Sequence, residues 1–356
     1  MSILLSIDPN LTPMDPSISI LLPVYNSASL LGDCFDSIES QTHRNYEVVA
    51  VDDGSTDGTS HLLKRRAGED RRIRPYSFAE NRGVVAALNY GLKRCRGFWI
   101  ARMDADDIMN PERLERQLDY MKRNPKVDIL GCRISLFRRE GVPTSGQLRY
   151  QDWSNSLITD ERIKQEIFAE SPIMHPTFFL RNEYFRTLNG YSDRPWAEDY
   201  DLLLKALLQK ATFAKLPEVL LLKRDHPNRV ARTDSRCKPK AMYRAKAFYF
   251  AKHFRLQGRR LLIVGNGPSA RQLVEALQRE GMKIDGFVQN RDNAKKGKNM
   301  GVPIHDISLQ DADAFFWRNR NAFFLLAVGD ATGKATLEKI LTGSGLRPGV
   351  HYYKFI

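Results

Sequence analysis

The chain has 356 residues and an ordinary globular composition, with 42% hydrophobic residues and room for one large core or two unequal ones. No apolar run is long enough to span a membrane, and the four cysteines lack the CxxC spacing of a zinc site or a disulfide framework. The net charge of +13 comes without a nucleic-acid recognition motif, so we expect no nucleic-acid partner. The first residues lack the basic start of a secretory signal, and we therefore expect a cytoplasmic protein with reduced thiols.

Strands and helices alternate in the N-terminal part of the chain. Strands are predicted at residues 18–22, 47–51, 73–77 and 98–102, with helices at 29–41, 58–63 and 84–94. This alternation predicts an α/β fold with a parallel sheet and right-handed crossovers. Ligands of such sheets bind beyond the carboxyl ends of the strands, where we expect Asn26, Asp53 and Asp106 to converge.

The later elements predict a second, smaller α/β domain. Strands at 128–137 and 177–181 and a helix at 199–209 still belong to the first domain. A basic helical region follows to about residue 257, and further strands are predicted at 260–264, 283–288 and 323–328. A new βαβ pattern thus begins just after Gly258. We predict a first domain over 1–230, a basic helical linker over 231–258 and a Rossmann-like domain over 259–356.

An acidic cluster follows the strand predicted at 98–102. Asp104, Asp106 and Asp107 place three carboxylates within four residues, where like charges repel one another and favour a cation between them. Oxygen ligands without a nearby Cys or His suit Mg²⁺ or Mn²⁺, which commonly bridge to substrate phosphates. The alternative is an acidic turn before the helix expected near Pro111, and we assign that capping role to Asp107.

Five motifs, in order, resemble family 2 of the inverting glycosyltransferases, which have a GT-A fold. They are Pro23-Val24-Tyr25-Asn26, Val51-Asp52-Asp53-Gly54-Ser55-Thr56-Asp57, Glu80-Asn81-Arg82-Gly83 with Ala87-Leu88-Asn89, Arg102-Met103-Asp104-Ala105-Asp106-Asp107, and Ala197-Glu198-Asp199-Tyr200-Asp201. The resemblance extends from about Ile18 to Val230, and five motifs together are specific where one would be weak. It implies a catalytic domain that moves a sugar from a nucleotide sugar, with UDP-sugars as the expected donors, to a hydroxyl of a cell-surface polysaccharide or glycolipid.

The same resemblance implies a nucleotide-sugar pocket. Its expected lining is Pro23, Val24, Tyr25, Asn26, Asp53, Asn81, Arg82, Asp104, Ala105, His175 and Arg229. Asp53 would accept the imide hydrogen of uracil, against an apolar and aromatic wall formed by residues 23–25. The alternatives are that Asp53 only caps the next helix, that residues 23–25 merely end a core strand, that Arg82 is a solvated surface charge and that His175 is structural.

Metal binding and catalysis are assigned by resemblance as well. Asp104 would contact the ribose or the donor sugar, and Asp106 would hold Mn²⁺ or Mg²⁺ on the diphosphate, where the metal neutralises charge on the leaving group. Asp199 would be the base that deprotonates the acceptor hydroxyl, and Glu198 would orient the acceptor. We expect Asp201 to turn away from the site, and capping the helix is the alternative for the acidic pair.

A basic loop at residues 223–229 resembles the family's flexible loop that closes over the diphosphate. His226 is the candidate second metal ligand, while Arg229 and Arg232 are candidate ligands of phosphate oxygens. The loop departs from the family pattern at Ala231, where a hydroxyl residue is common.

The Rossmann-like domain opens with Gly265-Asn266-Gly267-Pro268-Ser269-Ala270, which matches the G-x-G-x-x-A fingerprint of dinucleotide sites. Its second predicted strand ends at residues 288–290 without the acidic residue that grips an NAD ribose. The domain resembles Rossmann-like modules attached to sugar-modifying proteins, and the missing acid favours a scaffolding role over NAD binding.

Between the two domains, residues 231–260 carry ten Lys or Arg against one Asp, a local charge of about +9. Aromatic residues are interleaved with these cations at Tyr243, Phe248, Tyr249, Phe250 and Phe254. Such a segment is a candidate for peripheral contact with the inner face of the cell membrane, where lipid-linked acceptors reside. The alternative is that the rings dock the two domains together and the charges are solvated.

Three other functions are compatible with parts of this pattern. A nucleotidyltransferase also pairs Asp residues with magnesium, but it does not need the Glu198-Asp199 pair and normally has a Gly-rich phosphate loop near the first strand. A regulatory protein that binds nucleotide sugars would be expected to have lost Asp106 or Asp199, and both are present. A bifunctional chain would have an NAD-dependent C-terminal domain.

Overall fold

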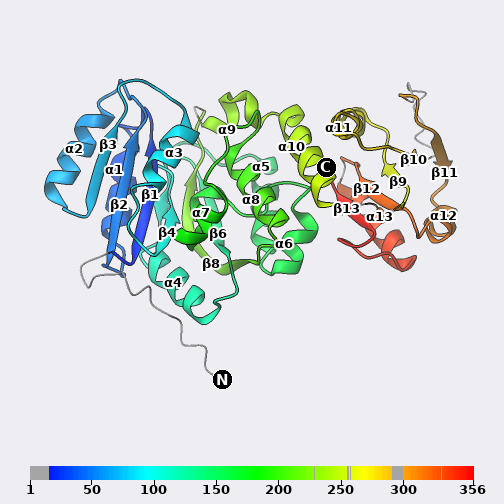
Figure 1. Ribbon diagram of the computed structural model, residues 1–356, viewed down its shortest axis with the longest axis horizontal. Helices are drawn as coiled ribbons and strands as arrows, with labels where there is room; N and C mark the ends of the chain where they lie inside the picture. The colour runs from blue at the N-terminus through cyan, green and yellow to red at the C-terminus, as the bar shows by residue number, and fades with distance from the viewer. Residues whose placement is uncertain (1–15, 228, 255, 257, 291–299, 330) are drawn as a thin grey trace. The chain divides into compact units, whose positions relative to one another are not determined.

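The computed structural model describes residues 16–227, 229–254, 256, 258–290, 300–329 and 331–356 (Figure 1). The chain divides into two compact units. The first comprises the residues up to 158 together with 173–193 and 211–227, and the second comprises 159–172, 194–210 and 228–356. The boundaries expected near residues 230 and 258 remain a prediction.

The first unit is built on an eight-stranded mixed sheet with the order β3-β2-β1-β4-β7-β6-β8-β5. Its strands are β1 Ile18–Val24, β2 Tyr46–Asp52, β3 Ile73–Ser77, β4 Trp99–Arg102, β5 Ile108–Met109, β6 Ile129–Phe137, β7 Phe179–Arg181 and β8 Phe213–Arg224. Strands β1 to β4 pair in parallel, as predicted, and β7 is antiparallel to β4 and β6. The carboxyl ends of β1, β2 and β4 therefore lie along one edge of the sheet.

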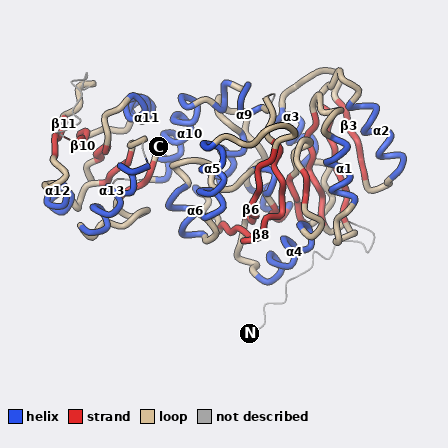
Figure 2. The backbone as a smooth tube through the Cα atoms, turned by 180° about the vertical axis from the view of Figure 1, so that it is seen from behind, coloured by secondary structure: helices blue, strands red, loops and turns tan. Residues whose placement is uncertain are grey.

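Helices flank this sheet, and Figure 2 shows them in blue beside the red strands. They are α1 Leu31–Glu39, α2 Thr59–Glu69, α3 Val84–Leu92, α4 Arg113–Arg123, α5 Ser145–Ser156 and α7 Asn182–Thr187. Apolar residues of the strands and of α1 and α4 form one buried cluster, in which Phe35, Ile20 and Leu114 are fully buried. Every residue of β2 is buried, which matches the run of apolar residues expected for a central parallel strand.

Strand β8 corrects one sequence prediction. We expected residues 210–257 to be helical, but residues 213–224 form the longest strand of the sheet, parallel to β6 and antiparallel to β5. Its pairing with β6 shifts register on either side of Arg133, and Pro217 and Glu218 have no partner on β6 in this register. A proline in the middle of an apolar run weakens the strand signal, because proline cannot donate a ladder hydrogen bond.

The second unit contains a five-stranded parallel sheet with the order β11-β10-β9-β12-β13. Its strands are β9 Leu261–Val264, β10 Gly286–Asn290, β11 Ile304–Ile307, β12 Phe323–Leu326 and β13 Tyr352–Lys354. Its helical segments are α6 Asp160–Glu166, α8 Glu198–Leu208, α9 Val230–Thr233, η2 Ser235–Cys237, α10 Pro239–His253, α11 Pro268–Arg279, α12 Ala312–Arg318 and α13 Ala331–Gly343. Numbered within this sheet, the strand order is the 3-2-1-4-5 order of a Rossmann-like fold, as predicted.

Helix α10 carries much of the basic segment, and its aromatic rings lie inside the second unit. Phe250 is fully buried, and its ring centroid is 4.8 Å from that of Phe254 and 5.2 Å from that of Phe355. Lys246 is buried as well, where it donates to the carbonyl oxygens of Ala169 and Phe355, and burial lowers the pKa of its ammonium to about 8. The rings of this segment therefore contribute to the core of the unit. Within the described part of the chain, no helix combines the length and apolarity required to cross a bilayer.

Candidate active site

The loops after β1 and β2 are tied together. Asn26 has a φ of 44°, and its side-chain oxygen accepts a hydrogen bond from the backbone N–H of Thr56 at 2.9 Å. The N–H of Asn26 in turn donates to the Ser55 hydroxyl at 2.9 Å. Tyr25 is 48% exposed, whereas Val24 lies in the hydrophobic core. Of the predicted apolar wall, only Pro23 and Tyr25 therefore present side chains outside the core.

Asp53 fixes the loop that carries Asn81 and Arg82. The side chain of Asp53 is buried, and its two carboxylate oxygens accept the backbone N–H groups of Arg82 at 2.7 Å and Gly83 at 2.9 Å. Burial raises the pKa of this carboxyl above its ordinary value. The alternative role as a helix cap is wrong, because α2 begins after Gly58 without a side-chain cap. Asn81 and Arg82 are exposed at the surface of this loop.

Gly54 allows the two loops to approach each other. It has a φ of +71°, and a Cβ at this position would lie 2.4 Å from the backbone carbon of Glu80. We expect Gly54→Ala to destabilise the protein by about 2–4 kcal/mol, because a methyl group would collide with backbone in an already unfavourable conformation. The control is Gly58→Ala, where φ is +89° but no heavy atom lies within 4 Å, and which should cost about 1 kcal/mol. Thermal unfolding midpoints would test this, and equal losses for the two variants would contradict it.

The acidic cluster forms a compact group after β4. Asp104, Asp106 and Asp107 each offer one oxygen, and these oxygens all lie within 4.8 Å of one another. Asp107 is fully buried and accepts the backbone N–H of Arg224 at 2.9 Å. The capping role predicted for Asp107 is wrong, since α4 begins after Glu112 without a side-chain cap. The short strand β5 intervenes, and its pairing with β8 explains why Asp107 contacts β8 instead.

The end of β8 and the loop after it bring a histidine and two cations to this cluster. His226 Nε2 lies 2.9 Å from Asp106 Oδ2, so the two predicted metal ligands are adjacent. Arg224 donates to the Asp106 carbonyl at 2.9 Å and to the Asp33 carboxylate at 2.7 Å. Lys223 Nζ lies 3.6 Å from oxygens of both Asp104 and Asp107. The three carboxylates supply the oxygen donors that Mn²⁺ and Mg²⁺ prefer, and His226 would add one nitrogen donor.

Two cations in this site were not predicted from the sequence. Arg102 forms an ion pair with Asp104, and Lys223 bridges the cluster from β8 while only 10% of its side chain is exposed. Arg102 and Lys223 both lie on strands of the sheet, and Lys223 is far in the sequence from the carboxylates that it contacts. The available signal was the position of Lys223 and Arg224 at the start of the basic loop predicted at residues 223–229, and the structure places both residues in β8.

The proximity of Lys223 predicts an effect on metal binding. Lys223→Met removes a positive charge beside the carboxylates, and we expect the affinity for Mn²⁺ to rise on the order of tenfold through the loss of repulsion. Titration of Mn²⁺ followed by electron paramagnetic resonance would measure it without any assay of activity. Lys64→Met, at an exposed position on α2, is the matched control. Unchanged or weaker binding by the Lys223 variant would contradict the prediction.

His175 is buried near this site in the first unit. Its Nε2 lies 2.7 Å from the Tyr191 hydroxyl, and burial, reinforced by the Arg102 guanidinium, holds the pKa of its imidazole well below the ordinary value. The ring is therefore neutral at physiological pH. Asn89 fixes the same region, because its side-chain amide both donates to the carbonyl oxygen of Tyr191 at 2.8 Å and accepts the N–H of that residue at 2.9 Å.

The predicted catalytic carboxylates lie in the second unit, at the start of α8. Glu198 is largely buried, with Arg236 4.0 Å from its carboxylate, and Asp199 is half-buried. Burial raises the pKa of the neighbouring Cys237 thiol to about 12, and the negative charges of Asp199 and Glu198 contribute to that shift. Arg229 also belongs to this unit, where its carbonyl oxygen accepts the N–H of Arg232 at 2.8 Å.

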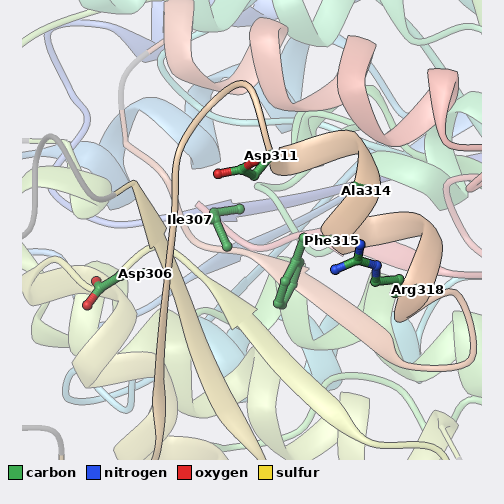
Figure 3. Close-up of a pocket in the computed structure, with 6 residues that line it drawn as sticks. All are labelled: Asp306, Ile307, Asp311, Ala314, Phe315 and Arg318. Atoms are coloured by element: carbon green, nitrogen blue, oxygen red, sulfur yellow. The ribbon is translucent and has the colours of Figure 1, made fainter.

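The glycine-rich turn of the second unit adopts the predicted strand-turn-helix geometry between β9 and α11. Gly265 has a φ of +108°, and a Cβ there would lie 2.7 Å from the Ala327 carbonyl oxygen. Beside α12 is a pocket of about 200 Å³, shown in Figure 3. It is lined by Asp306, Ile307, Asp311, Ala314, Phe315 and Arg318. These observations support the fold of the domain without favouring NAD as a ligand.

Comparison with known proteins places this site in a family. The model of glycosyl transferase family 2 matches residues 19–188. An uncharacterized glycosyltransferase of Haemophilus influenzae is 30% identical over 220 residues, which are 61% of this chain and 68% of that protein. The amylovoran biosynthesis glycosyltransferase AmsE of Erwinia amylovora is 31% identical over 208 residues, which are 57% of this chain and 74% of that protein.

Solved structures show the same fold. S. aureus TarS 1-349 in complex with UDP-GlcNAc aligns with a TM-score of 0.54 and 17% identity, over 92% of this chain and 80% of that one. The predicted fold class, a GT-A domain followed by a smaller Rossmann-like domain, is confirmed by this likeness and by the two sheets. With the family match and the two relatives, it follows that the chain belongs to glycosyl transferase family 2 and is a glycosyltransferase.

Proposed function

We propose that this glycosyltransferase is inverting and metal-dependent, and that it moves a sugar from a UDP-sugar to a hydroxyl of a cell-surface polysaccharide or glycolipid. The observation that carries the proposal is the group formed by Asp104, Asp106 and Asp107 after β4 with His226, which follows β8. The polysaccharide acceptor is supported by the name of AmsE, and the UDP-sugar donor by the UDP-GlcNAc complex of TarS.

Three residues have separate roles in this reaction. Asp53 organises the base-binding loop, Asp104 contacts the donor, and Asp199 takes the proton of the acceptor hydroxyl. The acceptor oxygen then forms a bond to the anomeric carbon from the face opposite the diphosphate. The bond from that carbon to the diphosphate oxygen breaks, and its electron pair leaves with the diphosphate, so the configuration at the carbon is inverted.

Asp106 and His226 would hold the metal ion, with Asp107 buried behind them. When bound, the ion supplies neutralisation of the charge that develops on the departing diphosphate. Arg229 and Arg232, in the segment that follows β8, would contact phosphate oxygens.

The basic segment supports peripheral contact with an anionic membrane surface. Cations at Arg232, Lys238, Lys240, Arg244, Lys252 and Arg260 are exposed, although the aromatic rings beside them are largely buried. Electrostatics would therefore dominate such contact, and each cation near the surface contributes on the order of 1 kcal/mol. Cosedimentation with phosphatidylserine vesicles at low and high salt would test it, and salt-independent binding or no binding would argue against it.

A panel of UDP-GlcNAc, UDP-glucose, UDP-galactose, GDP-mannose and dTDP-rhamnose, screened by thermal shift with and without Mn²⁺, tests the proposed function. A ligand that binds only the folded protein raises its unfolding temperature. We expect a UDP-sugar to give the largest shift, and only with the metal. If no nucleotide sugar stabilises the protein in the presence of Mn²⁺, the proposal fails.

A further inference from the structure

We infer that Asp201 is a positioning residue, which holds the start of α8 so that Asp199 points in the direction required of the catalytic base. The inference rests on the proposed role of Asp199. Asp201 is the third carboxylate of the acidic helix start, yet it does not face solvent, because its side chain is fully buried. A buried carboxylate is costly unless hydrogen bonds replace its lost hydration, so its partners show what it does there.

The Asp201 carboxylate joins two segments of the second unit. Its Oδ1 accepts a hydrogen bond from the indole N–H of Trp196 at 2.7 Å and another from the Tyr249 hydroxyl at 2.8 Å. Trp196 lies just before the helix and Tyr249 lies on α10. Both bonds end on one charged oxygen, and hydrogen bonds to an ionised acceptor are roughly twice as strong as neutral ones.

The start of α8 lacks a conventional cap, and the carboxylate of Asp199 itself accepts the backbone N–H of Tyr200 at 2.6 Å. The residue before α8, Ala197, has no side chain that could cap the helix, and its carbonyl oxygen accepts the N–H of Asp201 at 3.0 Å. The Trp196 bond closes a loop across the first turn of the helix, and this loop contains Asp199. The backbone that carries Asp199 is therefore fixed from both ends of that turn.

The residue after Asp199 is fixed as well. Tyr200 is fully buried, and its hydroxyl donates to the carbonyl oxygen of Ile167 at 2.6 Å. Asp199 is thus followed by two side chains, Tyr200 and Asp201, that are anchored to the segment after α6 and to α10, while Asp199 itself is only half-buried. An anchored frame around one accessible carboxylate is the arrangement expected for a general base, since a displacement of about 1 Å can cost on the order of a hundredfold in rate.

The second oxygen of Asp201 adds no stabilising hydrogen bond to the described part of the chain. Asp201 Oδ2 has no hydrogen-bond partner among the described residues, and an unpaired buried polar atom is unfavourable for stability. Burial beside the Asp201 charge also raises the pKa of the Tyr249 hydroxyl, which therefore stays protonated and remains a donor at every physiological pH.

The test follows the release of UDP with water as acceptor, using the UDP-sugar of the panel that gives the largest thermal shift. We expect Asp201→Ala to lower kcat about 10- to 100-fold with the KM for the donor unchanged, because the donor site itself is intact. Asp201→Asn keeps an acceptor oxygen for both donors, and we expect it to restore kcat to within about threefold of the wild-type value. Tyr249→Phe should lower kcat severalfold, and the matched control Tyr243→Phe, at another buried tyrosine of α10, should not.

The decisive measurement repeats Asp201→Ala in an Asp199→Asn background. If Asp201 acts through Asp199, adding Asp201→Ala to Asp199→Asn does not lower the residual rate further, because the carboxylate that Asp201 positions is already absent. The same loss in both backgrounds, or a wild-type kcat for Asp201→Ala, would overturn the inference. Should Asp201→Ala fail to fold, Tyr249→Phe in the two backgrounds gives the same comparison. Full activity of Asp199→Asn alone would instead refute the proposed base.

Discussion

Replacing Asp199 by asparagine is expected to abolish transfer while nucleotide binding is preserved. The amide has nearly the shape of the carboxylate but cannot accept the acceptor proton, and general-base catalysis contributes typically 10²- to 10⁴-fold. We therefore expect kcat to fall about a thousandfold, with the thermal shift caused by UDP and Mn²⁺ unchanged. The predicted donor-binding and metal-binding residues, apart from Arg229 and Arg232, belong to the first unit, whereas Asp199 belongs to the second. We therefore expect the loss of transfer to be separable from nucleotide binding.

Two companion variants sharpen this experiment. Glu198→Gln should have a smaller effect, because Glu198 is largely buried beside Arg236 and would only orient the acceptor. Asp193→Asn, at an exposed position before α8, should leave transfer unchanged. Wild-type activity of Asp199→Asn would show that the base lies elsewhere. Transfer by the wild-type chain that is lost in the variant would exclude a purely regulatory nucleotide-sugar-binding role.

The second large effect is expected for Asp106→Asn, which should eliminate metal-dependent donor binding. Asp106 shares the proposed ion with His226, whose Nε2 is 2.9 Å from its carboxylate. Loss of one anionic ligand weakens a site for a hard cation strongly, and the stabilisation that requires metal and nucleotide together should disappear. The measurement is the thermal shift with UDP at increasing Mn²⁺.

Its control is Asp119→Asn, which removes an exposed carboxylate on α4. Both substitutions change the net charge equally. A difference in thermal shift between the two variants is therefore caused by the loss of Asp106 from the acidic cluster and not by the change in net charge. A Mn²⁺-dependent shift of wild-type size in Asp106→Asn would refute the assignment of this residue as a metal ligand.

The first half of the sheet was predictable from the sequence because its signals are local. Apolar runs of strand length end at turn residues in β1 and β2, so both the strands and the convergence of the loops after them follow from short segments. The glycine-rich turn before α11 is equally local, which explains why the Rossmann-like sheet was expected correctly.

The parts that were missed depend on pairing between distant segments. Residues 213–224 read as part of a helical region, since Pro217 interrupts their apolar run and the partner strand β6 lies far away in the sequence. Without β8, neither the ammonium of Lys223 beside the carboxylates nor the contact of Asp107 with Arg224 could be derived. The anchoring of Asp201 was likewise hidden, because Tyr249 is 48 positions farther along the chain.

The way the chain divides between its two units also limits how the protein can be shortened. Residues 159–172 and 194–210 precede the expected boundary at residue 230, yet they belong to the same compact unit as the C-terminal residues. A gene truncated at that boundary would encode the acidic start of α8 without Tyr249 and without the aromatic residues around Phe250. The C-terminal region is therefore not a detachable appendage, and a stop codon there should yield a protein that is prone to proteolysis as well as inactive.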